Sequence, residues 1–268
     1  AAGGNASVTF DPWTFTSGTT YTVRDSVILS GDGNISNNAM SNTITPRIAK
    51  QMCVLWQQQE DRDSLVRAIN SDGRYANNFD TVRMNYTGSY KPWKFMFVNF
   101  KNESNYSPWV RDSLKAFLDQ STAGNKKSLI VFGNTLAVNN DPDINFFSNP
   151  ADTIFYRQYL KSRSISDNWP ANIPASGNKF RGTGFFSGVS QDSVSDPFTP
   201  ELVKPVNGGT AAFKPRSVSG NGNDSCNAVC FSGTNYNTFF MTNKFSSLRS
   251  TNSSPLDGPV LVYTKIID

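Results

Sequence analysis

The chain has 268 residues, of which 37% are hydrophobic and 13% aromatic, enough to build a packed core in one large domain or two small ones. Only 17% of the residues are charged, and the net charge of +4 is spread along the chain without a lysine and arginine cluster. This composition excludes the charge pattern of a nucleic-acid binder, and no run approaches the ~20 apolar residues of a membrane span.

The polar composition points to an extracellular setting. Asn, Ser, Thr and Gly crowd the loops, whereas surfaces rich in Lys and Glu are usual in cytosolic domains. The chain begins AAGGNAS, without an initiator Met, a basic region or an apolar leader, as an exported product does after its signal is removed. We therefore expect a secreted or cell-surface protein.

The first 25 residues alternate apolar and polar side chains between Gly- and Thr-rich turns, which predicts a β-hairpin or extended arm. Residues 27–34 (VILSGDGN) resemble a first parallel strand that runs into a turn. Thr45 and Pro46 then provide a helix cap and a first-turn proline. The helical face expected after them contains Ile48, Met52, Leu55 and Trp56.

Strands and helices alternate through the middle of the chain. The β-rich runs are residues 79–84, 94–100 and 127–133. Two helices are expected, one after Ser107 and Pro108 and one after Asn149 and Pro150. The first carries Val110, Leu114, Phe117 and Leu118, and the second carries Ile154, Phe155, Tyr159 and Leu160. This order predicts an α/β fold with a mostly parallel sheet and right-handed crossovers.

The section from about 165 to 235 is rich in Gly, Asn, Ser and Pro. Short runs at 180–186, 227–233 and 236–242 predict long loops and an antiparallel extension of the sheet. Residues 258–268 (GPVLVYTKIID) fit a closing helix begun by Pro259, although their Val and Ile content leaves a strand open. The expected organisation is an arm over residues 1–25 and one α/β domain over 26–268.

From VILSGDGN through SPWVRDSLKAFLDQ and NKKSLIVFGN to GPVLVYTKIID, roughly residues 25–268, the chain resembles flavodoxin-like domains related to class I glutamine amidotransferases and ThuA. Such domains occur in large secreted proteins of Bacteroidetes and Ignavibacteria, often exported by type IX secretion. The resemblance implies a flavodoxin-like sheet with flanking helices. It also implies a ligand edge at the turn after LIVFG, where Asn134 and Thr135 stand.

The family's chemistry does not carry over to this sequence. Amidotransferases place a cysteine on that turn and use a histidine as the base, whereas this chain has Asn134 there and no histidine at all. Thiolate and Ser–His–Asp catalysis need the imidazole or an equivalent activating group. Asp32, between Gly31 and Gly33, is a further candidate at the ligand edge. Asp80, Asp141 or Asp143 would supply the second carboxylate of a hydrolase.

Residues 141–152 have the spacing of a Ca²⁺ loop, the only cofactor that the sequence suggests. The oxygen ligands would be Asp141, Asp143, Asn145 and Asp152. The match is imperfect, because Phe146 stands where a Ca²⁺ loop has the glycine of its sharp turn and Pro142 stiffens the beginning of the loop. The alternative is a helix-capping loop with Asp152 in the first helical turn.

Cys226 and Cys230 are close enough in DSCNAVC to form a small disulfide loop, with buried free thiols as the alternative. Several large aromatic side chains fit either sugar stacking or core packing. They are Trp13, Trp93, Tyr106, Trp109 and Trp169.

Asp followed by Ser or Thr and an aliphatic residue recurs along the chain, as in the O-glycosylation motif of Bacteroidetes secretory proteins. Its hydroxyl residues are Ser26, Ser64, Thr81, Ser113, Thr153 and Ser193. Local capping, in which carboxylate and hydroxyl bind nearby backbone amides, explains the same pattern without a glycan.

Two functions from different classes remain. The first is a non-enzymatic extracellular structural or interaction module, such as a self-assembling filament or matrix subunit whose arm adds to a neighbour's sheet edge. Its partners would be further copies or other surface proteins. The second is a carbohydrate-binding or carboxylate-dependent hydrolase domain that acts at the carboxyl edge of the sheet. A pocket with two carboxylates near Asp32 and residues 134–145 would favour the second.

Overall fold

The structure is a computed structural model that describes residues 9, 11–27, 31, 33–34, 36, 38–46, 50–86, 88–100, 107–133, 136, 141–142, 149–166, 180–191, 193–194, 201–215, 225–249 and 257–268. It divides into two compact units, Ala1–Ala49 and Lys50–Asp268. The expected boundary at residue 25 instead falls inside the first unit, because the strand there pairs with a later strand. Among the described residues, no helix is both long and apolar enough to cross a membrane.

The first unit is built on a β-hairpin. Strands β1 (Tyr21–Ser26) and β2 (Ala39–Ile44) pair antiparallel, from Tyr21 opposite Ile44 to Ser26 opposite Ala39. The backbone N–H of Val27 continues the ladder by donating to the Asn38 carbonyl at 2.8 Å. Val27 therefore belongs to the hairpin and does not begin a parallel strand, so that prediction is wrong at this residue.

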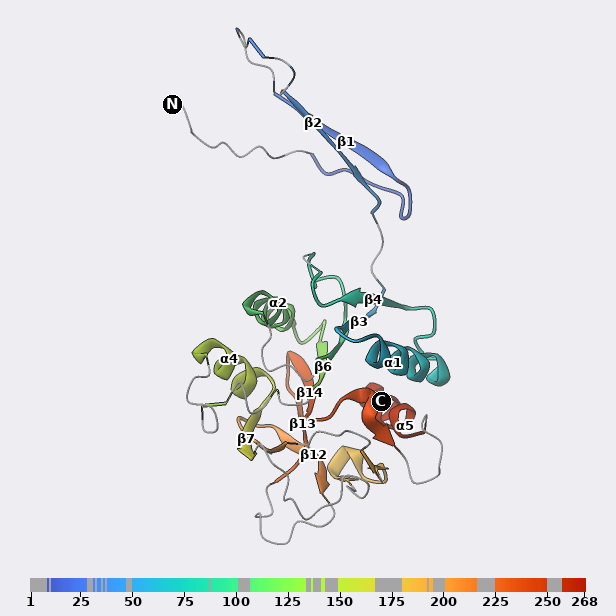
Figure 1. Ribbon diagram of the computed structural model, residues 1–268, viewed down its shortest axis with the longest axis vertical. Coiled ribbons are helices and arrows are strands. Elements are labelled where there is room, and N and C mark those ends of the chain that lie inside the picture. The colour runs from blue at the N-terminus through green and yellow to red at the C-terminus, as the bar shows by residue number, and fades with distance from the viewer. Residues whose placement is uncertain are drawn as a thin grey trace. The chain divides into compact units, whose positions relative to one another are not determined.

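The second unit contains the α/β core (Figure 1). Its parallel part and helices are β3 (Met52–Trp56), α1 (Gln59–Asp72), β4 (Phe79–Arg83), β5 (Phe95–Asn99), α2 (Pro108–Asp119), β6 (Lys127–Phe132), α4 (Pro150–Ile154), the π-helical turn η2 (Phe155–Tyr159), β14 (Tyr236–Met241) and α5 (Asp257–Ile267). Its other elements are β7 (Ser162–Ser166), β8 (Phe180–Gly182), η3 (Gly184–Phe186), β9 (Ser190–Gln191), β10 (Ser193–Val194), β11 (Leu202–Pro205), β12 (Thr210–Pro215), β13 (Ala228–Ser232), η4 (Phe245–Ser247) and β15 (Leu248–Arg249).

The main sheet has nine strands in the order β4-β3-β5-β6-β14-β13-β12-β8-β9. The first five strands are mutually parallel. Numbered by their place in the chain, these five have the order 2-1-3-4-5, which is the flavodoxin-like order. The remaining strands join antiparallel. The expected α/β fold with an antiparallel extension is therefore confirmed.

Two elements differ from the sequence prediction. The run Met52–Trp56, expected within a helix, is the fully buried strand β3. It lies between β4 and β5, so its side chains are covered on both faces and alternation is lost. Strand β14, expected in the antiparallel extension, pairs parallel with β6. It is the fifth parallel strand of the core.

Helices α1 and α5 lie on one side of the sheet, and α2 and α4 lie on the other (Figure 1). The two helix starts expected at Ser107 and Asn149 are confirmed, because Ser107 Oγ accepts from the Val110 N–H and Asn149 Oδ1 accepts from the Ala151 N–H. These bonds satisfy amide donors that the first turn leaves free. The closing segment is a helix, α5.

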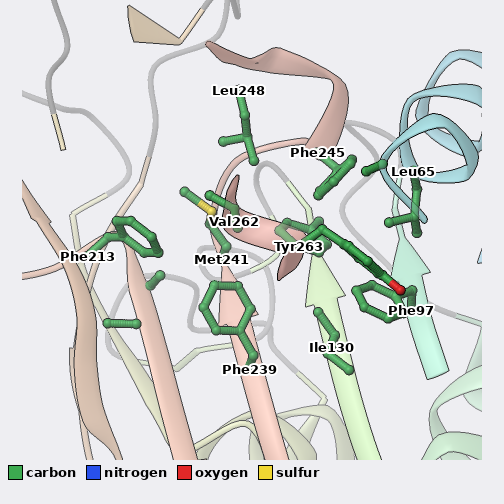
Figure 2. Close-up of a cluster of buried hydrophobic side chains, with 14 of the residues drawn as sticks. Leu65, Phe97, Ile130, Phe213, Phe239, Met241, Phe245, Leu248, Val262 and Tyr263 are labelled. Atoms are coloured by element: carbon green, nitrogen blue, oxygen red, sulfur yellow. The ribbon is translucent and has the colours of Figure 1, made fainter. Parts of the chain in front are cut away.

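The core between the sheet and α5 is rich in aromatic side chains. Side chains from β5, β6, β12 and β14 gather around Val262 and Tyr263 of α5 (Figure 2). The Tyr263 ring centroid is 5.5 Å from that of Phe97, and Phe132 lies 5.0 Å from Phe245. This packing fixes the sheet whose carboxyl edge positions the candidate site.

Candidate functional site

The carboxyl ends of the parallel strands form the candidate site. The connection after β3 leads to β4 on one side, whereas the connection after the adjacent strand β5 leads to β6 on the other side. Open α/β sheets bind ligands at such a switch point. A cavity of about 440 Å³ lies there, lined by Trp56, Gln57, Arg83, Met84, Asn85, Ser107 and Val110.

Two guanidinium groups stack on the Trp56 indole. The Arg62 guanidinium carbon lies 4.8 Å from the ring centroid, and that of Arg83 lies 4.9 Å from it. Arg62 also pairs with Asp63 at 2.7 Å. The cation–π contacts hold both cations beside the cavity.

Buried polar atoms without partners lie at the same edge. Trp56 is 7% exposed and Asn99, its register neighbour on β5, is 1% exposed. Within the described part of the chain, Trp56 Nε1 and both side-chain amide atoms of Asn99 make no hydrogen bond. Buried polar groups are nearly always paired, so these atoms mark a place where water or a ligand group binds.

Helix α2 adds positive electrostatic potential to the cavity. Its amino terminus, with Ser107 as the cap, faces the cavity through Ser107 and Val110. A helix of this length has a partial positive charge at its amino end. Together with Arg83, it makes this edge suited to a negatively charged group.

The sequence predicted this edge but not these residues. Asp32, Asn134 and Thr135 lie outside the described residues. Trp56, Arg83 and Asn99 were missed, although each ends a parallel strand. A polar or aromatic side chain at the last position of a buried strand is the signal that would have found them.

The expected Ca²⁺ ligands do not converge where they are described. Asp141 is fully buried, pairs with Arg157 Nη2 at 2.5 Å and accepts the Ser164 N–H at 2.7 Å. Asp152 lies in the first turn of α4 and pairs with Arg111 Nη1 at 2.9 Å. The two carboxylates thus occupy separate ion pairs rather than one coordination sphere. Asp143 and Asn145 fall outside the described residues.

The disulfide prediction is wrong, because Cys226 and Cys230 are both free. Cys226 Sγ donates to the Val203 carbonyl at 3.3 Å, and Cys230 Sγ lies 3.1 Å from Thr210 Oγ1. Cys230 is in β13 and Cys226 precedes that strand, and the two sulfur atoms contact different partners. The alternative, free thiols, is confirmed.

The candidate glycosylation residues differ in exposure. Ser26 and Thr81 are exposed, Ser113 and Thr153 are half-buried, and Ser64 is buried at 9% exposure. The side chain of Ser193 lies outside the description. Thr153 Oγ1 donates to the Asn149 carbonyl at 3.3 Å, which is a local contact with a carbonyl and not the bond to a backbone N–H that the capping alternative expects. Ser26 and Thr81 are thus the most accessible members of the set.

The predicted aromatic candidates have separate environments. Trp93 is buried, and its Nε1 donates to Asp80 Oδ2 at 2.8 Å. Trp109 is exposed on α2, and Trp13 packs edge-on against Tyr21 in the first unit, with ring centroids 4.6 Å apart. Tyr106 and Trp169 fall outside the described part. Core packing therefore accounts for Trp93.

No protein-family profile matches the chain, and a search of curated proteins finds no significant relative. Among solved structures, the chain is similar to a β-galactosidase from the Antarctic haloarchaeon Halorubrum lacusprofundi, at 9% identity and a TM-score of 0.49. That similarity covers 83% of this chain but only 30% of the galactosidase, so the chain spans less than a third of its length.

Two further solved structures are similar over nearly their whole length. A ThuA-like protein from Parabacteroides merdae has 9% identity and a TM-score of 0.46, covering 82% of this chain and 89% of that chain. PurLQS from Thermotoga maritima has 7% identity and a TM-score of 0.47, covering 81% of this chain and 98% of that chain.

Proposed function

We propose that this protein is a non-enzymatic extracellular interaction module that self-associates through its N-terminal hairpin. The observation that carries the proposal is an exposed apolar face on that hairpin. Tyr21 and Val23 of β1 share this face with Met40 and Ile44 of β2, since side chains alternate along each strand, and the polar side chains on the same face are Asp25 and Asn42. Met40 is 61% exposed, and Val23 and Ile44 are exposed as well.

A two-stranded hairpin is at best marginally stable in water, and its outer edges offer unpaired backbone groups. A partner that covers the apolar face or extends the ladder would stabilise it. The partner proposed here is a second copy, because among the described strands β4 is an outer strand of the main sheet and pairs on one side only. Hairpin-to-β4 contacts are head-to-tail, and such contacts build filaments where the rotation does not close.

The test compares lysines placed on the two faces of the hairpin. Val23→Lys with Met40→Lys puts charges on the apolar face, whereas Thr22→Lys with Ser41→Lys puts them in the matching diagonal positions on the polar face. We expect polymers or oligomers of the wild type and of the polar-face variant by light scattering and electron microscopy. The apolar-face variant should be monomeric. A monomeric wild type, or equal assembly of both variants, contradicts the proposal.

The extracellular location is inferred from the low charged fraction and the abundance of Asn, Ser and Thr. Export by type IX secretion and O-glycosylation belong to the same proposal. Intact mass of protein purified from its native source measures the glycan directly. Peptide mapping should place modification at Ser26 or Thr81 rather than at buried Ser64, and a mass equal to the polypeptide contradicts glycosylation.

A ligand-binding role is the second candidate, and the cavity at the sheet edge favours it. Its described lining supplies guanidinium, amide, hydroxyl, thioether and indole groups, with no carboxylate among these described residues. Such groups bind polar or anionic ligands, whereas a hydrolase of the carboxylate type needs a pair of acids. We therefore propose binding, rather than bond cleavage, at this edge.

A further inference from the structure

We propose that the cavity at the carboxyl edge binds an organic anion, meaning a phosphate, sulfate or carboxylate group attached to a less polar body, and that Arg83 is its main contact. This inference rests on the ligand-binding role proposed above, and the cavity lies in the second unit at the end of β4. Arg83 ends the outer strand β4 and lines the cavity.

The guanidinium of Arg83 is held in place but not neutralised. It stacks on Trp56 at 4.9 Å, and within the described residues it makes no ion pair. Other arginines of this unit are engaged by carboxylates, as Arg74 is by Asp72 and Arg111 by Asp152. A guanidinium has five donors in a planar fork that fits an oxyanion. Arg83 therefore presents an oriented fork at the cavity.

The surroundings add positive potential and further donors. Arg62 lies against the same indole, and the amino end of the twelve-residue helix α2 lies at the cavity wall. The Trp56 N–H is buried and unpartnered within the described part of the chain, and Trp56 lines the cavity. Because Asp63 pairs with Arg62, the positive potential comes from Arg83 and the helix dipole, and these together with the unused N–H donor favour a negative ligand group.

The size and the apolar wall point to a ligand larger than a bare ion. The cavity measures about 440 Å³, within the range of small-molecule sites. Met84 and Val110 contribute apolar surface beside the polar lining. Phenyl phosphate combines an oxyanion with a flat apolar ring and is the probe we would use. Inorganic phosphate and benzyl alcohol test the two parts separately.

The readout is the indole N–H resonance of Trp56 in a spectrum of the full chain labelled with nitrogen-15, assigned with Trp56→Phe. Phenyl phosphate should shift this resonance in a saturable way and bind more tightly than inorganic phosphate or benzyl alcohol. Arg83→Gln should weaken binding at least about tenfold, the effect of losing one charge-assisted contact. Arg181→Gln removes the same charge from an exposed position on β8 and should leave binding unchanged.

A second variant protects the test against a folding defect. Asn85→Asp keeps the size of an exposed lining residue and adds a negative charge, so it should also weaken phenyl phosphate binding. The proposal is overturned if phenyl phosphate at about 10 mM leaves the resonance unchanged, a concentration that detects even very weak binding. It is equally overturned if Arg83→Gln and Arg181→Gln weaken binding alike. If inorganic phosphate binds as tightly as phenyl phosphate, the proposal that the ligand has a less polar body is overturned.

Discussion

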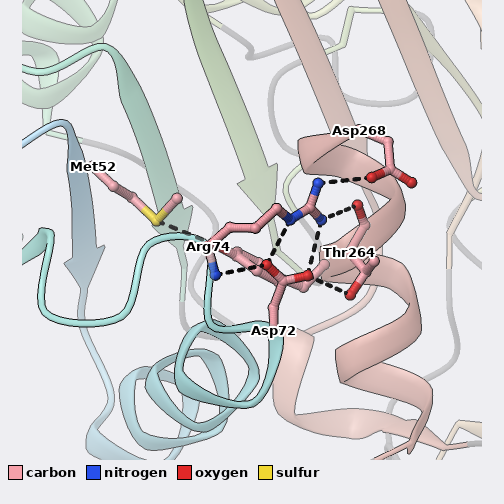
Figure 3. Close-up of polar contacts among 6 residues, drawn as sticks. Met52, Asp72, Arg74, Thr264 and Asp268 are labelled. Carbon is pink, nitrogen blue, oxygen red and sulfur yellow. Dashed lines mark hydrogen bonds and ion pairs between the residues drawn. The ribbon is translucent and has the colours of Figure 1, made fainter.

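Arg74 and Asp268 are 194 residues apart in the chain, yet Arg74 Nη1 donates to Asp268 Oδ1 at 2.7 Å (Figure 3). The same guanidinium binds Asp72 through Nε and Nη2 and donates to the Thr264 carbonyl at 2.9 Å. One side chain thus joins the end of α1 to the last turn of α5. The Thr264 carbonyl also accepts the Asp268 backbone N–H at 3.1 Å, so Arg74 adds a second donor to it.

Arg74→Gln should lower the free energy of unfolding by ~1 kcal/mol, a modest amount because the Arg74 side chain is 38% exposed and its ion pairs are screened by solvent. The measurement is urea-induced unfolding followed by circular dichroism. Arg181→Gln, which removes a charge from exposed β8, is the matched control and should change stability little. Equal effects of the two variants would show that α5 does not depend on this contact.

Asp61 should make the protein less stable as the pH rises. Burial raises the pKa of this carboxyl, partly offset by the hydrogen bond from Ser246 Oγ to Asp61 Oδ1. A folded pKa above the unfolded value of about 3.9 favours folding at low pH and loses that contribution as pH rises through the folded pKa. Asp61→Asn should therefore flatten the fall in stability between about pH 4 and 7. If urea unfolding gives the wild type and Asp61→Asn the same dependence of stability on pH, this prediction is contradicted.

The three cysteines should be inert in the native protein. Burial raises the pKa of Cys226 to about 12 and raises the pKa values of Cys53 and Cys230 as well. Because the thiolate is the reactive form, a thiol reagent at neutral pH should label none of them quickly. All three should react once the chain is unfolded in guanidinium without a reductant. Recovery of only one reactive thiol would reveal a disulfide.

Phe239→Ala should cost ~3–5 kcal/mol, because it removes a buried ring from the core between the sheet and α5. Phe239 is 4% exposed, and its ring lies 5.7 Å from Phe132 and 5.4 Å from Phe186. Phe185→Ala removes the same side chain from a neighbouring site that is 55% exposed and should cost under ~1 kcal/mol. Similar losses in thermal and urea unfolding would show that this core is not closely packed.

The sequence predicted elements whose ends are marked locally. Helix α2 was found because Ser107 and Pro108 start it and its apolar side chains have helical spacing. Strand β3 was missed because MCVLW is apolar throughout, and a fully buried strand has no alternation to separate it from a buried helix. Thr45 and Pro46, which have the sequence of a helix start, also favoured a helix over this run. The parallel pairing of β14 with β6 depends on contacts far apart in the chain, which no local pattern records.

The candidate site was predictable as a place but not as a set of residues. A mostly parallel sheet was enough to locate a ligand edge at the ends of its strands. Which side chains meet there depends on strand order, because Trp56 lies beside Arg83 and Asn99 only when β3 is between β4 and β5. The sequence indicated carboxylates at this edge, whereas the described cavity lining is cationic and amide-rich.

The pairing of β6 with β14 has a consequence for how the protein is made. Their contacts, such as that between Ser128 and Asn237, span 109 residues. During synthesis, β6 therefore emerges long before β14, the strand that pairs with it, and parallel pairing over such a distance forms slowly. Until then the backbone N–H and C=O groups on that side of β6 have no partner strand and can pair with other chains. Cells that produce this protein would need to delay its folding or shield the nascent chain until β14 has emerged.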